Sequence, residues 1–135
     1  MQRFNIRVYG LIFNENQQVL LCNEVHKEKH LIKFPGGGLE WGESTIDCLK
    51  RELAEEFNLT LLTHEIFYVT DFFQVSFFNA NDQVVSIYYL SKVAGEPLSN
   101  EQNVDFFWAD VAALNLEDVT FPIDRHVLSL LKNRV

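Results

Sequence analysis

The sequence predicts an α+β fold in which the strands of a mixed β-sheet surround one central helix, and a second helix closes the chain. Three observations support this prediction. Runs rich in branched and aromatic residues precede and follow a stretch whose apolar residues recur at helical spacing. The glycines concentrate between residues 36 and 42, directly before that stretch. A final apolar stripe at helical spacing follows Pro122.

The first elements are two predicted core strands. Residues 5–13 and 18–22 are rich in branched and aromatic side chains, and the polar residues 14–17 between them are typical of a turn. The charged stretch that follows contains His26 and His30. Their spacing would suit a metal only on a helix, so we expect a solvated loop there.

The central helix is predicted over residues 45–57. Ser44 and Asp47 are spaced as in a capping box, with aspartate in place of the usual glutamate. The apolar residues then follow at helical spacing: Ile46, Leu49, Leu53 and Phe57.

Three more strands are predicted after the helix. Residues 65–78 and 83–93 are β-rich and are joined by residues 79–82, whose composition suits a hairpin loop. A third strand is expected at residues 105–108. Most phenylalanines of the first run should be core residues, although one at a cleft edge could stack on a nucleobase. They are Phe67, Phe72, Phe73, Phe77 and Phe78.

The closing helix is predicted over residues 121–131, with Pro122 in its first turn. Its apolar stripe consists of Val127, Leu128 and Leu131. Trp41 lies in the glycine-rich loop, and we expect its indole to pack against the start of the central helix rather than stack on a base or cover a partner.

Length and composition fit one compact domain over residues 1–135. Hydrophobic residues make up 47% of the chain and can build a core without disulfide or metal support. Cys22 and Cys48 have no second cysteine at a ligand spacing, so we expect buried thiols. The amino-terminal segment lacks the apolar stretch of a signal peptide, and no run is long enough to cross a bilayer. This predicts a cytoplasmic protein without a membrane partner.

The formal net charge of −8 argues against a long nucleic acid as partner, because such binding depends on lysine and arginine neutralising phosphates. A small phosphate ligand is compatible with this charge, since a divalent cation held by carboxylates can reverse the local field. An acidic protein that acts on an acidic substrate therefore implies a metal ion.

Residues 37–59 read GGLEWGESTIDCLKRELAEEFNL. This stretch resembles the Nudix box, G-x5-E-x7-R-E-U-x-E-E-x-G-U, in which U is an aliphatic residue. Every defined position matches except Asn58, which stands where the motif has glycine. Asparagine is the commonest substitute for glycine in the left-handed conformation at a helix end, so the exception is physically mild.

Three glutamates of the predicted helix, Glu52, Glu55 and Glu56, lie within one sector of its surface roughly 100° wide. Like charges at this spacing repel, and Mg²⁺, or Mn²⁺ in its place, would compensate because both ions favour oxygen ligands. The resemblance implies the same metal site. It adds the backbone carbonyl of Gly36, because a carbonyl of this loop binds metal in Nudix proteins.

Further roles follow from position. Arg51 lies four residues before Glu55 and is expected to orient that carboxylate within the catalytic site. Glu52 is the first candidate for the general base, and Glu101, outside the box, is the second. Glu43 could join the metal shell or hydrogen-bond the loop, as could Glu40. The candidates for substrate contact are Arg7, Lys33, Gly37 and Glu40.

The resemblance implies a fold and a reaction. The fold would be a Nudix α/β/α sandwich with a mixed β-sheet, a catalytic helix and a C-terminal helix. The reaction would be hydrolysis of a diphosphate linkage in a small nucleotide-like substrate: a nucleoside triphosphate, ADP-ribose or a nucleotide sugar. The alternative is a non-catalytic regulator that binds a nucleotide or metabolite, although no box carboxylate is lost. A homodimer is left open.

Overall fold

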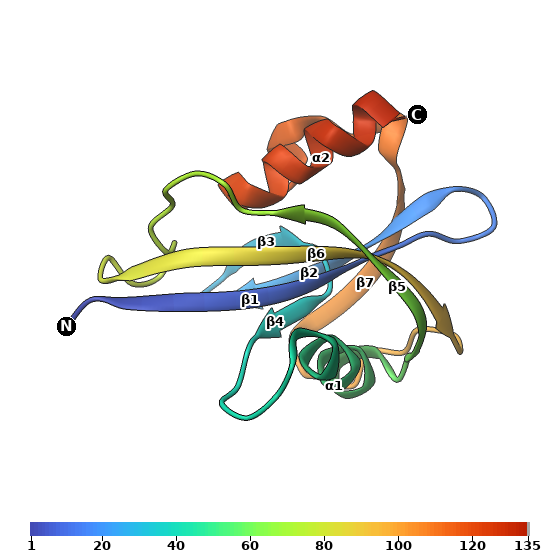
Figure 1. Cartoon of the computed structure of the whole chain (residues 1–135). Coiled ribbons are helices and arrows are strands. Elements are labelled where there is room, and N and C mark those ends of the chain that lie inside the picture. The colour runs from blue at the N-terminus through green and yellow to red at the C-terminus, as the bar shows by residue number, and fades with distance from the viewer. Residues whose placement is uncertain (135) are drawn as a thin grey trace.

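The computed structural model describes residues 1–134, and its architecture confirms the predicted fold class. Two β-sheets lie between two helices, with α1 on one side and α2 on the other (Figure 1). The strands are β1 (Arg3–Ile12), β2 (Gln18–His26), β3 (Lys29–Lys33), β4 (Gly36–Gly38), β5 (Thr60–Val69), β6 (Asp82–Ala94) and β7 (Val104–Asp110). The helices are α1 (Thr45–Phe57), α2 (Pro122–Arg134) and the short 3-10 turns η1 (Val111–Ala113) and η2 (Leu116–Asp118).

The larger sheet is mixed and has the strand order β4-β1-β6-β5. β1 pairs in parallel with β6 and antiparallel with β4, while β5 and β6 are antiparallel. The smaller sheet, β3-β2-β7, is antiparallel throughout. The glycine cluster thus forms an edge strand beside β1, with Gly38 opposite Arg7.

Successive residues of β1 face two separate cores. Val8 and Ile12 belong to the core that includes the apolar stripe of α1, whereas Tyr9 and Leu11 belong to the core that includes the stripe of α2. Side chains of a strand alternate between its two faces, so each face of β1 is covered by one helix. This explains why the strand has a continuous apolar run rather than an alternating pattern.

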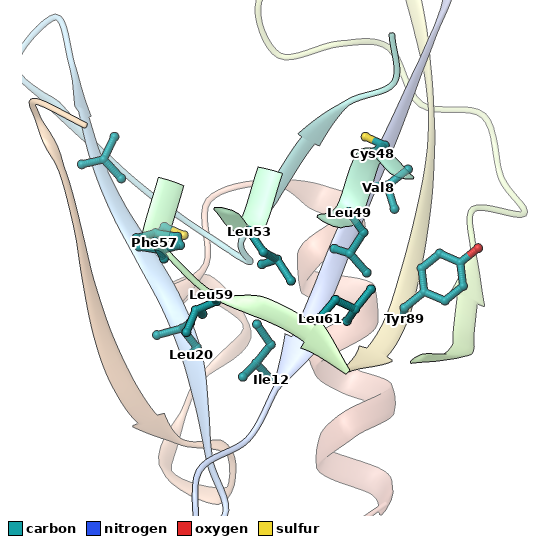
Figure 2. Packing of buried hydrophobic residues seen from close by; sticks show 12 residues of the cluster. Val8, Ile12, Leu20, Cys48, Leu49, Leu53, Phe57, Leu59, Leu61 and Tyr89 are labelled. Carbon is teal, nitrogen blue, oxygen red and sulfur yellow. The ribbon is translucent and has the colours of Figure 1, made fainter. Parts of the chain in front are cut away.

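The apolar face of α1, the helix that carries Glu52, Glu55 and Glu56, packs on the first of these two cores (Figure 2). Cys48, Leu49, Leu53 and Phe57 are fully buried on α1 and pack toward the strands. Their partners in this cluster include Val8, Ile12, Leu20, Leu59, Leu61 and Tyr89. Cys22 is also buried, so both cysteines are free, buried thiols as predicted.

Both ends of α1 lie where the sequence places them. The Ser44 hydroxyl accepts a hydrogen bond from the Asp47 N–H at 3.0 Å, and the Asp47 carboxylate accepts one from the Ser44 N–H at 3.3 Å. Asn58 ends the helix in the left-handed conformation, with φ of 61°, and its N–H donates to the carbonyl of Ala54. The asparagine therefore performs the backbone role that the motif gives to glycine.

Replacing Ser44 with alanine is expected to lower the free energy of unfolding by about 1 kcal/mol, because the N–H of Asp47 loses its acceptor. Urea denaturation of the variant and the wild type measures the difference. A loss below a few tenths of a kcal/mol would contradict a stabilising role for this cap.

The predicted strand over residues 65–78 is wrong at both ends. β5 begins at Thr60 and ends at Val69, and residues 70–81 follow an irregular path. A register shift between Ile66 and Tyr68 distorts the pairing of β5 with β6, and such shifts bend a strand. The Tyr68 hydroxyl then donates to Asp71 at 2.5 Å as the chain leaves the sheet.

The phenylalanines of this irregular segment are not core residues, so that prediction is also wrong. Phe73, Phe77 and Phe78 are between 56% and 71% exposed, and Phe72 is 39% exposed. Phe67, still within β5, is partly buried against the core beneath α2. The prediction assumed a regular strand, but β5 ends at Val69, and the segment returns to β6 only through an isolated bridge between Val75 and Gln83.

Two other local predictions are wrong. Trp41 is fully exposed instead of packing against the start of α1. His26 and His30 lie in a β-hairpin rather than a loop, because β2 continues to His26 and pairs with β3. The hairpin turns at Lys27 and Glu28, which both adopt positive φ values that glycine or asparagine usually supplies. Neither β3 nor the glycine strand β4 was predicted.

Strand β7 and helix α2 agree with prediction. Val127, Leu128 and Leu131 are buried against the sheets, and Pro122 is the first residue of α2. No helix in residues 1–134 combines the length and the apolar character that crossing a bilayer requires.

Candidate active site

Two glycines of β4, Gly36 and Gly37, lie so close to neighbouring atoms that a side chain at either position would collide with them. At Gly36, φ is +145° and a Cβ would lie 2.1 Å from the carbonyl oxygen of Val8. A Cβ at Gly37 would lie 2.6 Å from the carboxyl carbon of Glu52. The carboxylate of Glu52 is therefore held directly against the backbone of β4, which is possible only because residue 37 lacks a side chain.

The guanidinium of Arg51 joins the glycine-rich loop to α1. Its Nη2 and Nε donate to the two carboxylate oxygens of Glu43 at 2.7 and 3.0 Å. Its Nη1 donates to Glu52 at 2.8 Å, and its Nη2 also donates to the carbonyl of Gly38 at 3.0 Å. The predicted contact with Glu55 exists but is longer, at 3.4 Å. Arg51 thus orients Glu52 and the loop more closely than it orients Glu55.

Glu43 hydrogen-bonds the loop, which was one of the two alternatives for it. Its carboxylate accepts the N–H of Glu40 at 2.9 Å. The hydrogen bonds from Arg51, together with that from the Glu40 N–H, lower the pKa of Glu43 to about 2. Glu43 therefore stays ionised and keeps the loop closed on α1. Glu40 itself is exposed, with its carboxylate 3.7 Å from Arg51.

Glu56 is buried, and its Oε1 is the one enclosed side-chain oxygen or nitrogen in residues 1–134 without a hydrogen-bond partner. Burial raises the pKa of Glu56. The ammonium of Lys33 opposes this shift, and the carboxylates of Glu52 and Glu101 add to it. A buried carboxylate with an unused oxygen, crowded by a second carboxylate, lacks a positive partner at that oxygen.

Glu101 is brought to this pair by the loop after β6. The N–H of Leu98 donates to the carbonyl of Phe57 at 3.0 Å, and the N–H of Asn100 donates to the carbonyl of Glu56 at 2.9 Å. These bonds anchor the loop on the last turn of α1. The influence of Glu101 on the pKa of Glu56 follows from this placement.

The donor set fits a divalent cation, although its side chains are not gathered into one cluster. Glu52 and Glu56 offer adjacent carboxylates, which are the oxygen ligands that Mg²⁺ and Mn²⁺ favour. The side chain of Glu55 is 57% exposed and lies toward Arg51. In the described part of the chain, no three His, Cys, Asp or Glu side chains lie close enough to hold a metal ion. The ligand set of Glu52, Glu55, Glu56 and the Gly36 carbonyl stays a prediction.

Two cations lie beside these carboxylates, the half-buried Arg7 and the buried Lys33. The Nε of Arg7 donates to the hydroxyl of Tyr9 at 2.6 Å, and the Nζ of Lys33 lies 3.6 Å from a carboxylate oxygen of Glu24. Burial lowers the pKa of Arg7, but Tyr9 and the carboxylates of Glu52 and Asp124 outweigh it, so the pKa lies above its usual value.

Burial also lowers the pKa of Lys33, and Tyr9, Glu56 and Glu24 more than compensate. Both predicted substrate-binding cations therefore stay charged at neutral pH, close to the α1 carboxylates.

A cavity of about 280 Å³ adjoins the two cations, which form part of its wall. Phe77, Phe78 and Phe121 also line it, and we call these three residues the aromatic rim. Their rings contact one another edge to face, with centroids 5.1 to 6.1 Å apart. The wall also includes Tyr88 from β6 and the almost fully buried Asp124 from the first turn of α2.

Sequence reasoning missed this cavity. An aspartate near the start of a helix is common, because it complements the helix dipole, so Asp124 carries no functional signal in the sequence. Tyr88 lies in an apolar strand and reads as a core residue. The aromatic rim joins Phe77 and Phe78 of the irregular segment with Phe121, the residue directly before α2, and only the fold brings them together.

A family model described as the NUDIX domain matches residues 3–131, which is nearly the whole chain. The chain belongs to the Nudix family. The resemblance read from residues 37–59 is therefore confirmed.

Two curated relatives point in the same direction. An 8-oxo-dGTP diphosphatase of Haemophilus influenzae is 30% identical over 110 residues, which cover 78% of this chain and 76% of the relative. An 8-oxo-dGTP diphosphatase of Escherichia coli strain K12 is 26% identical over 137 residues and covers 98% of each chain. This Nudix protein is accordingly a pyrophosphohydrolase that acts on phosphoanhydride bonds, and Nudix hydrolases generally use a divalent metal.

Solved structures agree with the Nudix fold. A structure from a study of MutT from Aliivibrio salmonicida and Vibrio cholerae has a TM-score of 0.78 and 25% identity, covering 98% of this chain and 99% of that one. The solution structure of the Escherichia coli ORF135 protein has a TM-score of 0.80 at 18% identity, which supports the fold alone. It covers 99% of this chain and 93% of the other.

Proposed function

We propose that the protein hydrolyses purine nucleoside triphosphates, with an oxidised guanine nucleotide, 8-oxo-dGTP, as the preferred substrate. One observation carries the proposal. Arg7 and Asp124 line the same cavity, and Arg7 pairs with Gly38 of β4, beside Gly37, which lies against the Glu52 carboxylate. A ligand with phosphates at one end and a base at the other would span this distance, with its phosphates at the Nudix box and its base in the cavity.

The cavity suits a nucleobase. Its volume of about 280 Å³ is just below the range of pockets that hold whole drug-sized ligands, about 300 to 1,000 Å³. The aromatic rim offers ring faces and edges against which a base can pack. Asp124 supplies a carboxylate acceptor within the same wall.

A carboxylate acceptor favours guanine over adenine. Guanine presents N–H donors at N1 and at its exocyclic amine, and oxidation at C8 adds another at N7, where unmodified purines have only a lone pair. An ionised Asp124 can accept from adjacent donors on guanine, whereas adenine offers only its N6 amine, flanked by the lone pairs of N1 and N7. The relatives named 8-oxo-dGTP diphosphatases support the oxidised base as the first substrate to test.

The phosphates would lie between these two cations, Arg7 and Lys33, and the box. Arg7 and Lys33 are charged and line the cavity on the side of the α1 carboxylates, so they can neutralise phosphate oxygens. Glu52, Glu55, Glu56 and the Gly36 carbonyl would hold Mg²⁺ or Mn²⁺. When bound, such an ion polarises a phosphoryl oxygen and lowers the pKa of a water molecule.

A carboxylate of this chain would take the proton from the attacking water. Glu52 is the first candidate, because its carboxylate lies against β4 and is fixed by Arg51 at 2.8 Å. Glu101 is the second candidate, because its loop is anchored on the last turn of α1. The variant Glu101→Gln distinguishes the two candidates. It should lose most of kcat if Glu101 is the general base, and it should keep most of kcat if Glu52 is.

A substrate screen tests the proposal. The purified protein is incubated with Mg²⁺ and 8-oxo-dGTP, dGTP, dATP, ADP-ribose or a nucleotide sugar, and phosphate, diphosphate and nucleoside monophosphate are measured separately. We expect diphosphate and monophosphate from the guanine nucleotides, with kcat/KM for dATP at least about tenfold lower. Preference for ADP-ribose or a nucleotide sugar would contradict the proposal.

Removal of the metal provides a second test. Addition of EDTA is expected to abolish hydrolysis, and Mn²⁺ as well as Mg²⁺ should restore it. A protein that binds 8-oxo-dGTP in calorimetry but yields no product with either ion would be a nucleotide-binding regulator instead.

A further inference from the structure

Tyr88 and Asp124 form a buried pair in the wall of the cavity. The Tyr88 hydroxyl donates a hydrogen bond of 2.5 Å to Oδ1 of Asp124, between β6 and the first turn of α2. The two side chains are almost completely buried, yet both line the cavity. The bond therefore joins a strand to a helix at the place where the base would bind.

The carboxylate of Asp124 lines the cavity and has few donors around it. In residues 1–134, Tyr88 is the one side chain that donates a hydrogen bond to it, and the backbone N–H of Phe34 also acts on it. The two oxygens of a carboxylate together offer about four acceptor positions. Asp124 can therefore still accept hydrogen bonds from a ligand in the cavity.

A purely structural role does not explain the pair. The ring of Tyr88 is accounted for by packing, since it stacks on Tyr9 at 5.2 Å and meets Phe34 edge to face at 6.0 Å. Asp124 occupies the third position of α2, where a carboxylate commonly bonds the helix backbone, but its hydrogen bond goes to Tyr88 instead. A phenylalanine at position 88 and a leucine at position 124 would fill the same space, and they would avoid the desolvation cost of a buried carboxylate.

We propose that Tyr88 is a positioning residue for base selection: its hydroxyl holds the carboxylate of Asp124 in the cavity wall as an ionised acceptor for the base. The inference rests on the proposed function, because it takes the base to lie in this cavity. Asp124 would touch the substrate, and Tyr88 would act only through Asp124.

The charges around Asp124 support an ionised carboxylate. Burial raises the pKa of Asp124 to about 6, against lowering contributions from the Tyr88 hydroxyl, Lys33, the Phe34 N–H and Arg7. Tyr9 completes the titratable groups that face it from β1. With a pKa near 6, Asp124 is mostly ionised at neutral pH, and the hydrogen bond from Tyr88 is the largest of the effects that keep it so.

The variant Tyr88→Phe tests this role, because it removes the hydroxyl and keeps the ring. Loss of a hydrogen bond to a charged group should raise the pKa of Asp124 by about one pH unit. The substrate is expected to bind only the protein in which Asp124 is ionised. The KM of the variant for 8-oxo-dGTP should therefore be about fivefold higher than that of the wild type near pH 6, and the two KM values should be almost equal near pH 8.5. At saturating substrate, kcat should stay within about twofold. The phosphates of the substrate titrate in the same way with both proteins, so their effect on KM divides out when the two KM values are compared as a ratio.

Tyr68→Phe is the matched control. Its hydroxyl donates to Asp71 at the same distance of 2.5 Å, but this pair is exposed and does not line the cavity. Its KM ratio should remain near one at every pH. Asp124→Asn, which cannot ionise, should have a raised KM whose ratio to the wild-type value increases with pH.

A direct titration separates failure of this inference from failure of the proposed function. The carboxyl ¹³C signal of Asp124, assigned by its absence in Asp124→Asn, reports its pKa in the ligand-free protein. An unchanged pKa in Tyr88→Phe would overturn the role of Tyr88 whatever the substrate proves to be. A KM ratio that is raised equally at all pH values would also overturn it, since that result indicates a structural defect. If the wild type hydrolyses no purine triphosphate, the proposed function fails, and base selection by this pair fails with it even when the pKa shifts.

Discussion

Replacing Glu56 with glutamine is expected to lower kcat at least about 10³-fold while the protein remains folded. Glu56 is a buried carboxyl group with an unused oxygen, and burial and the neighbouring Glu52 raise its pKa, so a negative charge there contributes little to the stability of the free protein. Glutamine has nearly the same shape, and it avoids the cost of burying a charge. Stability measured by urea denaturation in EDTA should therefore be unchanged or higher.

The Glu56→Gln experiment needs a readout besides activity. Affinity for Mn²⁺, measured by calorimetry without substrate, should fall at least about tenfold, because one of the predicted oxygen ligands loses its charge. Glu65→Gln on β5 is the matched control, since it makes the same change at an exposed site and should affect neither quantity. Near-normal turnover by a folded Glu56→Gln protein would refute the assignment.

Replacing Gly37 with alanine should lower kcat/KM about 10²-fold with little change in stability. The added Cβ would lie 2.6 to 2.7 Å from the carboxylate atoms of Glu52, so the end of that side chain must move. Moving a flexible side chain costs little free energy of unfolding, but a displacement of about 1 Å at a reacting group can cost two orders of magnitude in rate. Steady-state kinetics and urea denaturation measure the two effects separately.

Gly38→Ala is the control for this substitution within the same strand. Its Cβ would lie 3.5 Å from Arg7, which is an ordinary contact, so we expect a several-fold loss of kcat/KM at most. Equal losses in the two variants would indicate a general disturbance of β4 rather than displacement of Glu52.

The parts of the molecule that sequence predicts well are those governed by local rules. The bounds of α1 follow from its capping box and from the tolerance of asparagine for the left-handed conformation, and both signals lie within a few residues of the helix ends. Most of the Nudix box is equally local, because Arg51, Glu52, Glu55 and Glu56 share one helix. The ion pair between Arg51 and Glu43 was less predictable, since it depends on how the loop folds back on α1.

The cavity depends on tertiary packing, which the sequence pattern does not encode. Tyr88 and Asp124 are 36 residues apart and meet because β6 and α2 pack together. The phenylalanines after β5 were misplaced because their β propensity is high and the end of the strand at Val69 leaves no compositional mark. Propensity predicts the element type, but it does not reveal where a strand leaves its sheet.

The irregular segment of residues 70–81 has a consequence for how this protein can diverge. It lies outside the paired length of β5 and contributes no residue to either buried core, yet residues 74–78 line the cavity. Substitutions at Phe77 and Phe78 would alter the surroundings of the base at little cost to the two cores or to the hydrolytic chemistry on α1. Changes confined to this segment can therefore alter substrate preference while the fold and the hydrolytic site are kept.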